Sequence, residues 1–147
     1  MEICVTPWQA NEIEEISRCE EACFAKPYSL KDIRELYESA HTRGFIARAD
    51  GAFVGYASLM SVCEDGDILR VAVYPAWRRK GFARALMTAL VAYAKEKDLE
   101  QIFLDVRVSN EAAIALYEGF AFEKIGVRKK YYENGEDAYM MRCRIQK

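Results

Sequence analysis

The chain has 147 residues, of which 52% are hydrophobic and 30% are charged, and its formal net charge is −2. This length and composition are typical of one globular domain, residues 1–147, that buries roughly two thirds of its surface. The slightly acidic balance argues against direct nucleic-acid binding, and no apolar run approaches the ~20 residues of a membrane span. Because the N-terminus lacks the pattern of a signal peptide, we predict a cytoplasmic protein that does not bind membranes.

The number and spacing of the cysteine and histidine residues disfavour a histidine-based catalytic device, a disulfide framework and a zinc ribbon. His41 is the only histidine, so a Ser-His-Asp or Cys-His device would need it as the base. The cysteines are odd in number and contain no Cys-x-x-Cys pair, which disfavours a disulfide framework or a zinc ribbon. We predict core or half-buried thiols and no bound metal for the five cysteines, which are Cys4, Cys19, Cys23, Cys63 and Cys143.

The first third of the chain predicts one strand and two helices. Residues 2–6 form a strand candidate, and residues 11–24 have the apolar spacing of an amphipathic helix. Pro27 stops that helix, and Ser29 can cap a second helix whose buried face carries Leu30, Ile33 and Leu36. The loop between the helices holds Phe24 and Tyr28 at its ends, and these rings either shape a pocket or fill the core beneath the loop.

A β-hairpin is predicted next. Asp50-Gly51 is a strong hairpin signal between the apolar residues 43–49 and 52–62. Residues 64–67 predict a turn into a further strand at residues 68–74, which Pro75 ends. Helical apolar spacing then returns at residues 82–93, so this part of the chain reads as strand, turn and helix, with the helix ending at Lys97 or Asp98.

This strand, turn and helix form a basic segment in an acidic chain. No Asp or Glu lies between Asp67 and Glu96. Removing the six cations of the segment from the total of 21 leaves 15 against 23 acids, a balance of −8. Helices usually favour acids in the first turn, so cations there indicate either an anion site at the helix N-terminus or a solvated turn. The six cations are Arg70, Arg78, Arg79, Lys80, Arg84 and Lys95.

The spacing of the glycine residues excludes two common phosphate-binding motifs. A nucleotide P-loop needs Gly-x4-Gly-Lys-Ser/Thr, and a dinucleotide fingerprint needs Gly-x-Gly-x-x-Gly; the sequence contains neither. The strand leads instead into Arg-x-x-Gly-x-Ala, from Arg78 to Ala83. Small residues at Gly81 and Ala83 would let an anion approach the backbone N–H groups at the start of the helix.

Asp105 is an anomaly in the next predicted strand. Residues 101–108 alternate between two faces, and a strand joined to the preceding one by a long helix implies a parallel crossover. A carboxylate in the middle of such an internal strand is costly unless it is paired or functional. Two interpretations remain open: an ion pair with Arg107 or Arg70, or a role in chemistry.

The last third predicts one helix and two strands. Ser109, Asn110 and Glu111 form a helix start, and Gly119 ends that helix. Asn110 and Tyr117 are seven residues apart, about two turns, so they share one face. Residues 122–132 and 138–144 are predicted to form strands on either side of a turn at residues 133–135.

Four segments together resemble the GCN5-related N-acetyltransferases (GNAT) and, within them, the RimI-like ribosomal-protein-alanine N-acetyltransferases. They are CFAKPYS, RVAVYPAWRRKGFAR, LDVRVSNEAAIALYEGFAF and RKKYYENGEDAYMM, which begin at residues 23, 70, 104 and 128. The resemblance covers nearly the whole chain. It implies an α/β fold with a mixed, mostly antiparallel sheet, a splayed parallel strand pair and flanking helices.

The resemblance also implies a site for acetyl-CoA as co-substrate. The pantetheine arm would bond to strand backbone, the pyrophosphate would lie on the amides that open the helix, and a helix-capping asparagine would contact the cofactor. The residues carried over are Val71, Ala72, Val73, Arg78, Arg79, Lys80, Gly81, Phe82, Ala83, Arg84 and Asn110.

The same resemblance implies catalytic and acceptor-binding residues. Asp105 stands where the family has a Glu as general base, and Tyr117 matches the general acid. The acceptor-binding candidates are Phe24, Tyr28, Tyr131 and Tyr132. The chain departs from the family pattern at Asp105, which is one methylene shorter than Glu, at Ala83, which replaces the commoner Gly, and at Tyr28, which replaces Trp.

Three functions remain in competition. The first is acetylation of a protein N-terminus, on this resemblance the terminal alanine of a ribosomal protein. The second is acetylation of a lysine side chain or a small amine. An α-amino group has a pKa near 7.7 to 8.0 and lysine near 10.4, so one weak carboxylate base favours the terminal amine. The third is a silent acyl-CoA-binding module, which the presence of both Tyr117 and a carboxylate at residue 105 disfavours.

Overall fold

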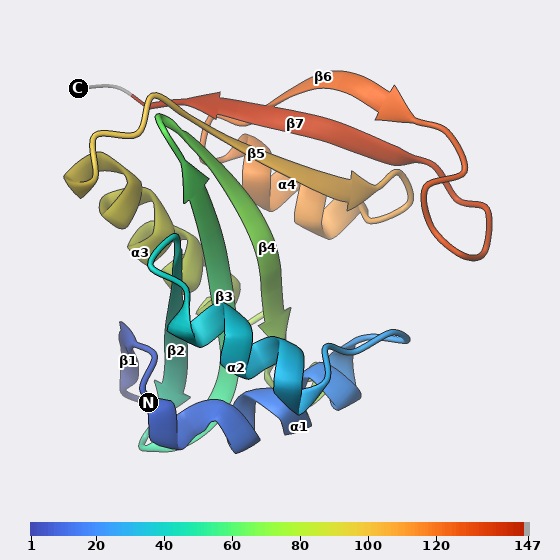
Figure 1. Ribbon diagram of the computed structural model, residues 1–147. Helices are drawn as coiled ribbons and strands as arrows, with labels where there is room; N and C mark the ends of the chain where they lie inside the picture. Colours follow the sequence, from blue (N-terminus) through green and yellow to red (C-terminus); the bar gives the residue numbers. More distant parts are fainter. Residues whose placement is uncertain (146–147) are drawn as a thin grey trace.

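The strands form one mixed sheet with the order β1-β2-β3-β4-β5-β7-β6 (Figure 1). The computed structural model describes residues 1–145. Within them only β4 and β5 pair in parallel, and all other neighbours are antiparallel. The predicted fold class is confirmed. The strands are β1 (Ile3–Pro7), β2 (Thr42–Ala49), β3 (Ala52–Val62), β4 (Asp65–Val73), β5 (Gln101–Arg107), β6 (Glu123–Arg128) and β7 (Ala138–Arg144).

Helices cover both faces of the sheet (Figure 1). The helices α3 and α4 pack on one face, over a core that includes Leu59, Leu104 and Met141. The helices α1 and α2 pack on the other face, over Ile46 and Tyr56. The helices are α1 (Ile13–Cys23), α2 (Leu30–Glu38), α3 (Phe82–Glu96) and α4 (Glu111–Glu118), with short 3-10 turns η1 (Ala10–Glu12) and η2 (Pro75–Trp77).

The sheet opens between β4 and β5. Their parallel pairing covers only three residue pairs and ends at Asp67 opposite Phe103. Beyond that point β4 follows β3 as far as Val73, while β5 follows β7. Among the described residues, the edge of β4 that faces β5 therefore has no strand partner from Ile68 to Val73. An unpaired strand edge presents backbone N–H and C=O groups that an extended ligand can bond.

Local sequence signals set several element boundaries correctly. Asp50 and Gly51 have φ values of 47° and 89°, as a tight hairpin turn requires. Ser29 caps α2, because its Oγ accepts a hydrogen bond from the Asp32 N–H at 3.0 Å. Ile33 is buried as predicted. Leu30 is 46% exposed, so its predicted place in the buried face was wrong: the first turn of α2 lies at the surface.

Other boundaries were misplaced. The turn predicted at residues 64–67 is a two-residue turn at Cys63 and Glu64, because Asp65 and Gly66 already pair with both β3 and β5. The last strand pair is shorter than predicted: β6 ends at Arg128, and Lys130 turns the chain away with a φ of 50°. The connection between β6 and β7 is therefore a nine-residue loop, residues 129–137, that carries Tyr131 and Tyr132.

Two thiols also differ from the prediction of core or half-buried cysteines. Cys63 is exposed because it forms the tip of the turn between β3 and β4, and Cys4 is exposed on the edge strand β1. Cys19 and Cys143 are buried, and Cys23 is half-buried, as predicted.

Candidate active site

The loop that leads into α3 has the backbone of an anion site. Arg79 and Gly81 both have positive φ values, 63° and 91°. Gly81 precedes the first helical residue and has no side chain to cap it, and a Cβ atom built on it would meet no atom within 4 Å. The first N–H groups of a helix lack partners within the helix, so this loop leaves them open to an anion.

The cations beside this loop are not neutralised by the protein. Arg79, Lys80 and Arg84 are exposed, and within residues 1–145 none forms an ion pair with a carboxylate. Lys80 lies 5.9 Å from the centre of the Trp77 ring, and Arg84 lies 5.8 Å from that of Phe120. A cluster of uncompensated cations around open N–H groups attracts a polyanionic ligand.

Arg78 makes a structural contact instead. Its Nε donates a hydrogen bond to the Val73 carbonyl oxygen at 2.9 Å, which ties the loop to the end of β4. The Cys23 thiol donates to the same oxygen at 3.5 Å, so α1 is joined to the loop as well. A hydrogen bond with Cys19, followed by the nearby Arg78, lowers the pKa of Cys23 to about 7.

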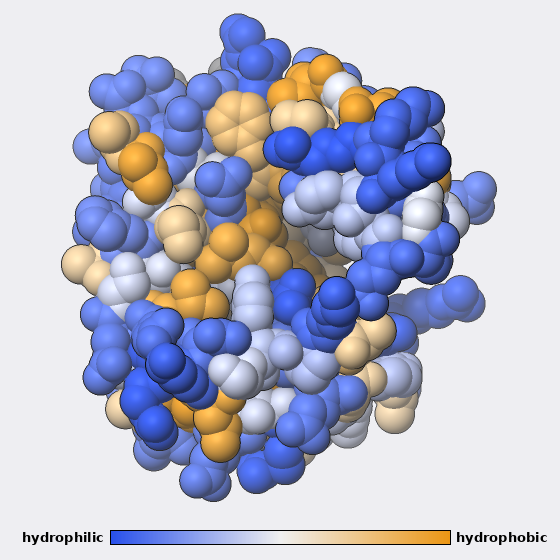
Figure 2. Space-filling model, turned by 45° about the vertical axis from the view of Figure 1, so that its right-hand side comes forward, coloured by the Kyte–Doolittle hydropathy of each residue, from blue (hydrophilic) through white to orange (hydrophobic). Residues whose placement is uncertain are grey.

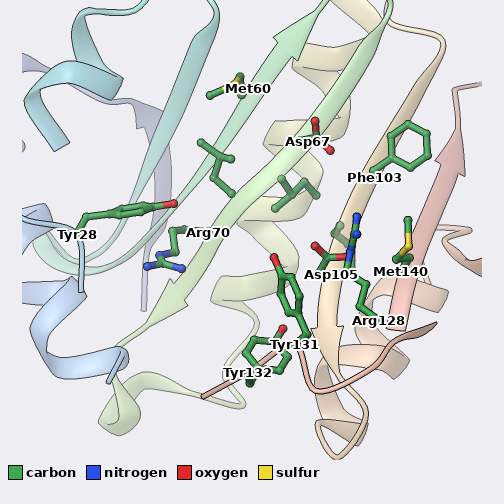
Figure 3. Close-up of a pocket in the computed structure, with 13 residues that line it drawn as sticks. Tyr28, Met60, Asp67, Arg70, Phe103, Asp105, Arg128, Tyr131, Tyr132 and Met140 are labelled. Carbon is green, nitrogen blue, oxygen red and sulfur yellow. The ribbon is translucent and has the colours of Figure 1, made fainter. Parts of the chain in front are cut away.

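A cavity of about 450 Å³ lies where β4 and β5 separate. Figure 3 shows Tyr28 and Arg70 on one side of it and Asp105 with Arg128 on the other. Three predicted acceptor-binding residues line it, namely Tyr28, Tyr131 and Tyr132. The full lining is Tyr28, Met60, Asp67, Ile68, Leu69, Arg70, Phe103, Leu104, Asp105, Arg128, Tyr131, Tyr132 and Met140.

Phe24, the fourth predicted acceptor-binding residue, is not among the residues that line the cavity. Its ring packs against Arg70, with the guanidinium carbon 4.1 Å from the ring centre. The Tyr28 ring lies at the same distance from that carbon. Arg70 therefore holds together the two ends of the loop between α1 and α2.

A buried carboxylate anchors Arg70. Glu20 of α1 is fully buried, and its Oε2 accepts a hydrogen bond from Arg70 Nε at 3.0 Å. The Tyr56 hydroxyl donates a short hydrogen bond to the same carboxylate, and the Tyr28 N–H donates to it at 2.8 Å. Burial, with the Glu20 charge as the next cause, raises the pKa of Tyr56. This network fixes one wall of the cavity.

Asp105 lies on the opposite wall, two residues beyond the last pair between β4 and β5. Its Oδ1 accepts a hydrogen bond from Arg128 Nε at 3.1 Å, and its side chain keeps 28% of its exposure. The partner predicted from the sequence, Arg107 or Arg70, was wrong: Arg107 pairs with Glu136 at 3.2 Å, and Arg70 pairs with Glu20. A hydrogen bond with the Asp105 carboxylate, together with its charge, raises the pKa of Arg128.

Asp67 is a second carboxylate in the cavity. It lies on β4 and opposes Phe103 of β5. Burial, together with the charges of Asp105 and Asp65, raises the pKa of Asp67 from its ordinary value. Within the described residues it forms no ion pair.

Tyr117 and Asn110 lie outside the cavity lining. Tyr117 of α4 packs against Phe122, with ring centres 6.0 Å apart. Burial, and to a smaller extent the charge of Tyr132, raises the pKa of Tyr117 to about 12. Asn110 caps α4, because its Oδ1 accepts from the Ala113 N–H at 3.2 Å.

Sequence reasoning missed three charged residues of this site. Glu20 sits in the apolar stripe of α1, one residue after Cys19, and that position was a signal of a buried carboxylate. Asp67 was assigned to a turn because acidic residues and glycine surround it. Arg128 had no local signal, since its pairing with Asp105 depends on the register of β6, β7 and β5.

Comparisons with known proteins show the family of this chain. Residues 13–122 match the model of the acetyltransferase (GNAT) family. The chain belongs to this family. Family membership makes the protein an N-acetyltransferase with acetyl-CoA as the acetyl donor, as predicted.

The relatives include several N-terminal acetyltransferases. An N-alpha-acetyltransferase of Saccharolobus solfataricus is 38% identical over 79% of this chain and 70% of its own length. The N-alpha-acetyltransferase RimI of Mycobacterium tuberculosis is 35% identical over 74% of this chain and 70% of its own. The crystal structure of the ribosomal-protein-S18-alanine N-acetyltransferase from Escherichia coli superimposes with a TM-score of 0.91 at 27% identity, covering 99% of this chain and 96% of that one.

Two further observations concern residues 1–145. None of their helices has the length and apolar character that crossing a membrane requires. No group of three or more His, Cys, Asp or Glu side chains among them is arranged to hold a metal ion.

Proposed function

We propose that this protein transfers the acetyl group of acetyl-CoA to the free α-amino group of a protein N-terminus, and that its natural acceptor in the cytoplasm is the N-terminal alanine of a small-subunit ribosomal protein. The observation that carries the proposal is the cavity between β4 and β5. It opens beside the unpaired edge of β4, with a carboxylate on one wall and tyrosines from two loops around it. The name of the Escherichia coli structural relative supports the acceptor.

The donor side fits acetyl-CoA. Gly81 leaves room for an anion at the start of α3, and Arg79, Lys80 and Arg84 would neutralise the phosphates. The β5-facing edge of β4 would hydrogen-bond the pantetheine amides, with Val71 and Ala72 as the central residues. The Val73 carbonyl already accepts hydrogen bonds from Arg78 and Cys23, so its part is to position the loop.

Asp105 is the base in this proposal. Its Oδ1 is held by Arg128, while its Oδ2 has no hydrogen-bond partner within the described residues and is available to accept a proton. The short side chain would act through a water molecule. Because an α-amino group has a pKa near 7.7 to 8.0, a weak carboxylate suffices to collect its proton near neutral pH.

Tyr117 is the acid. The neutral amine attacks the thioester carbon while both substrates are bound, the C–S bond breaks, and the phenol protonates the departing CoA sulfur. With a pKa of about 12, Tyr117 stays protonated well above neutral pH, and it can still donate as charge develops on sulfur. No cysteine takes part in the transfer.

Two peptides test the proposal. One carries a free N-terminal alanine and no lysine, and the other has a blocked N-terminus and an internal lysine. We expect acetyl-CoA-dependent acetylation of the first, located by mass spectrometry on the α-amino group, and at least a tenfold lower kcat/KM for the second. Equal or greater activity on the blocked peptide would assign the protein to the lysine acetyltransferases instead.

A further inference from the structure

A second cavity of about 430 Å³ adjoins the one that holds Asp105. The two share Tyr28, Met60 and Leu69 in their linings, so they lie side by side, and we refer to them together as the groove. We call the second cavity the α2 subsite; it is lined by Tyr28, Asp32, Glu35, Leu36, Ser39, Thr42, Met60 and Leu69. Figure 2 shows apolar side chains gathered in a hollow in the middle of the molecule, surrounded by hydrophilic ones.

The charges along this groove do not balance. Its two cations are both engaged, Arg70 with Glu20 and Arg128 with Asp105. Three carboxylates that line it have no ion-pair partner within residues 1–145, and they are Asp32, Glu35 and Asp67. In the described part of the chain, the Asp32 carboxylate accepts only a backbone hydrogen bond, from Ser29. The groove as a whole therefore presents negative charge to whatever occupies it.

A buried hydroxyl lies at the floor of the α2 subsite. Thr42 is 7% exposed, and its Oγ1 has no hydrogen-bond partner within residues 1–145. Thr42 opposes Met60 in the register of β2 and β3, and both residues line the subsite. Buried polar atoms are nearly always hydrogen-bonded, so an unpaired hydroxyl beneath a groove indicates that a ligand or its water supplies the partner.

We infer that the α2 subsite binds the residues that follow the N-terminal residue of the acceptor, and that it selects acceptors with a positively charged side chain in that segment. The inference rests on the proposed function, because it extends the acceptor chain from the cavity of Asp105 into the adjoining space. The aliphatic stem of a lysine or arginine would lie on Met60, Leu36 and Leu69. Its charged end would reach Glu35 at the rim.

Charge-matched peptides test this inference. Three peptides with a free N-terminus share their first two residues and carry two lysines, two glutamines or two glutamates in the following positions. For the wild-type protein at low salt we expect kcat/KM to fall at least tenfold from the lysine to the glutamate peptide, mostly through KM. Equal values for the three peptides would overturn the inference while leaving N-terminal acetylation intact.

Glu35→Lys separates the subsite from the overall charge of the protein. This variant should reduce the preference for the lysine peptide to threefold or less. Glu38→Lys makes the same charge change on the same helix at an exposed residue outside the lining, and it should keep the preference. If both variants behaved alike, the selectivity would come from net charge and the subsite would be wrong. If no peptide with a free N-terminus were acetylated by the wild-type protein, the proposed function itself would fail.

Thr42→Val tests the floor of the subsite with an almost isosteric change. We expect KM for the lysine peptide to rise three- to tenfold, and KM for an N-terminal dipeptide amide, which is too short to reach the subsite, to stay unchanged. An equal rise for both acceptors would mean that Thr42 shapes the fold and not the subsite. Thermal unfolding of the variant confirms that the comparison is made on folded protein.

Discussion

The two ends of the candidate active site leave opposite charges uncompensated. At the start of α3, Arg79, Lys80 and Arg84 have no carboxylate partner in the described part of the chain. In the groove on the other side of the sheet opening, both cations are paired and the unpaired groups are carboxylates. An anionic donor and a cationic acceptor would therefore each meet the charge that attracts it.

Charged residues at this site are of two kinds: some are paired within the protein, and others are left unpaired. Arg70 and Glu20 are charged and lie at the proposed acceptor cavity, yet each is satisfied by the other and by neighbouring groups. Together, Arg70 and Glu20 hold the loop between α1 and α2 in place. Charges that the fold leaves unpaired at the surface of a groove are the better candidates for contact with substrates.

The largest expected effect is on the chemical step. Tyr117→Phe should lower kcat by about 10²- to 10⁴-fold and leave the affinity for acetyl-CoA nearly unchanged, because only the proton donor is removed. Tyr37→Phe is the control, since Tyr37 packs against Trp8 away from the cavity. Wild-type kcat in the Tyr37 variant and a normal kcat in the Tyr117 variant together would exclude Tyr117 as the acid.

Tyr117 also predicts a pH dependence of stability. Its folded-state pKa of about 12 lies above the ordinary value of 10. A raised pKa means that the folded state holds the proton more tightly than the unfolded state. The stabilisation is therefore complete below pH 10 and is lost as the pH rises towards 12. Denaturant unfolding of the wild type and Tyr117→Phe should show a difference between them that changes only in this alkaline range.

Removing the proposed base, Asp105, should be nearly as severe but should depend on pH. Asp105→Asn is expected to lower kcat/KM about 10²-fold or more at pH 7, with partial recovery above about pH 8, where the terminal amine loses its proton unaided. Asp105→Glu restores the residue of the RimI-like family and should keep or raise activity. A fully active Asp105→Asn, combined with a trapped acetyl-enzyme and a dead Cys63 or Cys143 variant, would establish a covalent route.

Breaking the buried pair of Glu20 and Arg70 should mainly lower the free energy of unfolding. Glu20→Ala leaves Arg70 without its carboxylate, and removing one partner of a buried pair typically costs about 3 to 5 kcal/mol. Because the Arg70 side chain keeps 21% of its exposure, we expect a loss of about 2 to 4 kcal/mol in the free energy of unfolding. Glu21→Ala, at an exposed neighbouring residue, should change it by less than about 0.5 kcal/mol. Equal values for the two variants would mean that the Glu20 network does not stabilise the fold.

Matched valine substitutions at two glycines test whether the loop before α3 binds an anion. Gly81 and Gly51 both have φ near 90°, and a Cβ atom at either position would meet no neighbour within 4 Å. Valine at each position should cost a similar strain of about 1 to 2 kcal/mol. Only Gly81→Val should lose the thermal stabilisation by acetyl-CoA, because only there does the side chain obstruct an anion. A retained shift in Gly81→Val would contradict the phosphate site.

Much of the fold was predictable because its signals are local. The Asp50-Gly51 turn, the Ser29 cap and the glycine at the start of α3 each specify backbone within a few residues. The resemblance to a family supplied the splayed strand pair. The end of β6 was predicted wrongly because the strand pattern in the sequence continues past Arg128. In the structure, Lys130 turns the chain away soon after Arg128.

The candidate site was less predictable, because its contacts join distant parts of the chain. Asp105 stood out as a carboxylate in an apolar strand, but its partner Arg128 is 23 residues away and is brought there by the pairing of β5, β7 and β6. The exposure of Asp105 depends on the separation of β4 and β5, which no local pattern encodes. No local pattern marked Glu35 or Thr42 as a site residue, because the fold is what brings them together in the lining of the α2 subsite.

The salt dependence of the two KM values tests the opposed charges most directly. Screening grows as the Debye length falls from about 30 Å at 0.01 M to about 10 Å at 0.1 M salt. With a lysine-containing acceptor, we predict that KM rises with salt for both acetyl-CoA and the peptide. With the glutamine peptide, only the KM of acetyl-CoA should rise. A peptide KM that is equally insensitive to salt for both acceptors would contradict a negatively charged acceptor groove, and a salt-insensitive KM for acetyl-CoA would contradict the cationic loop.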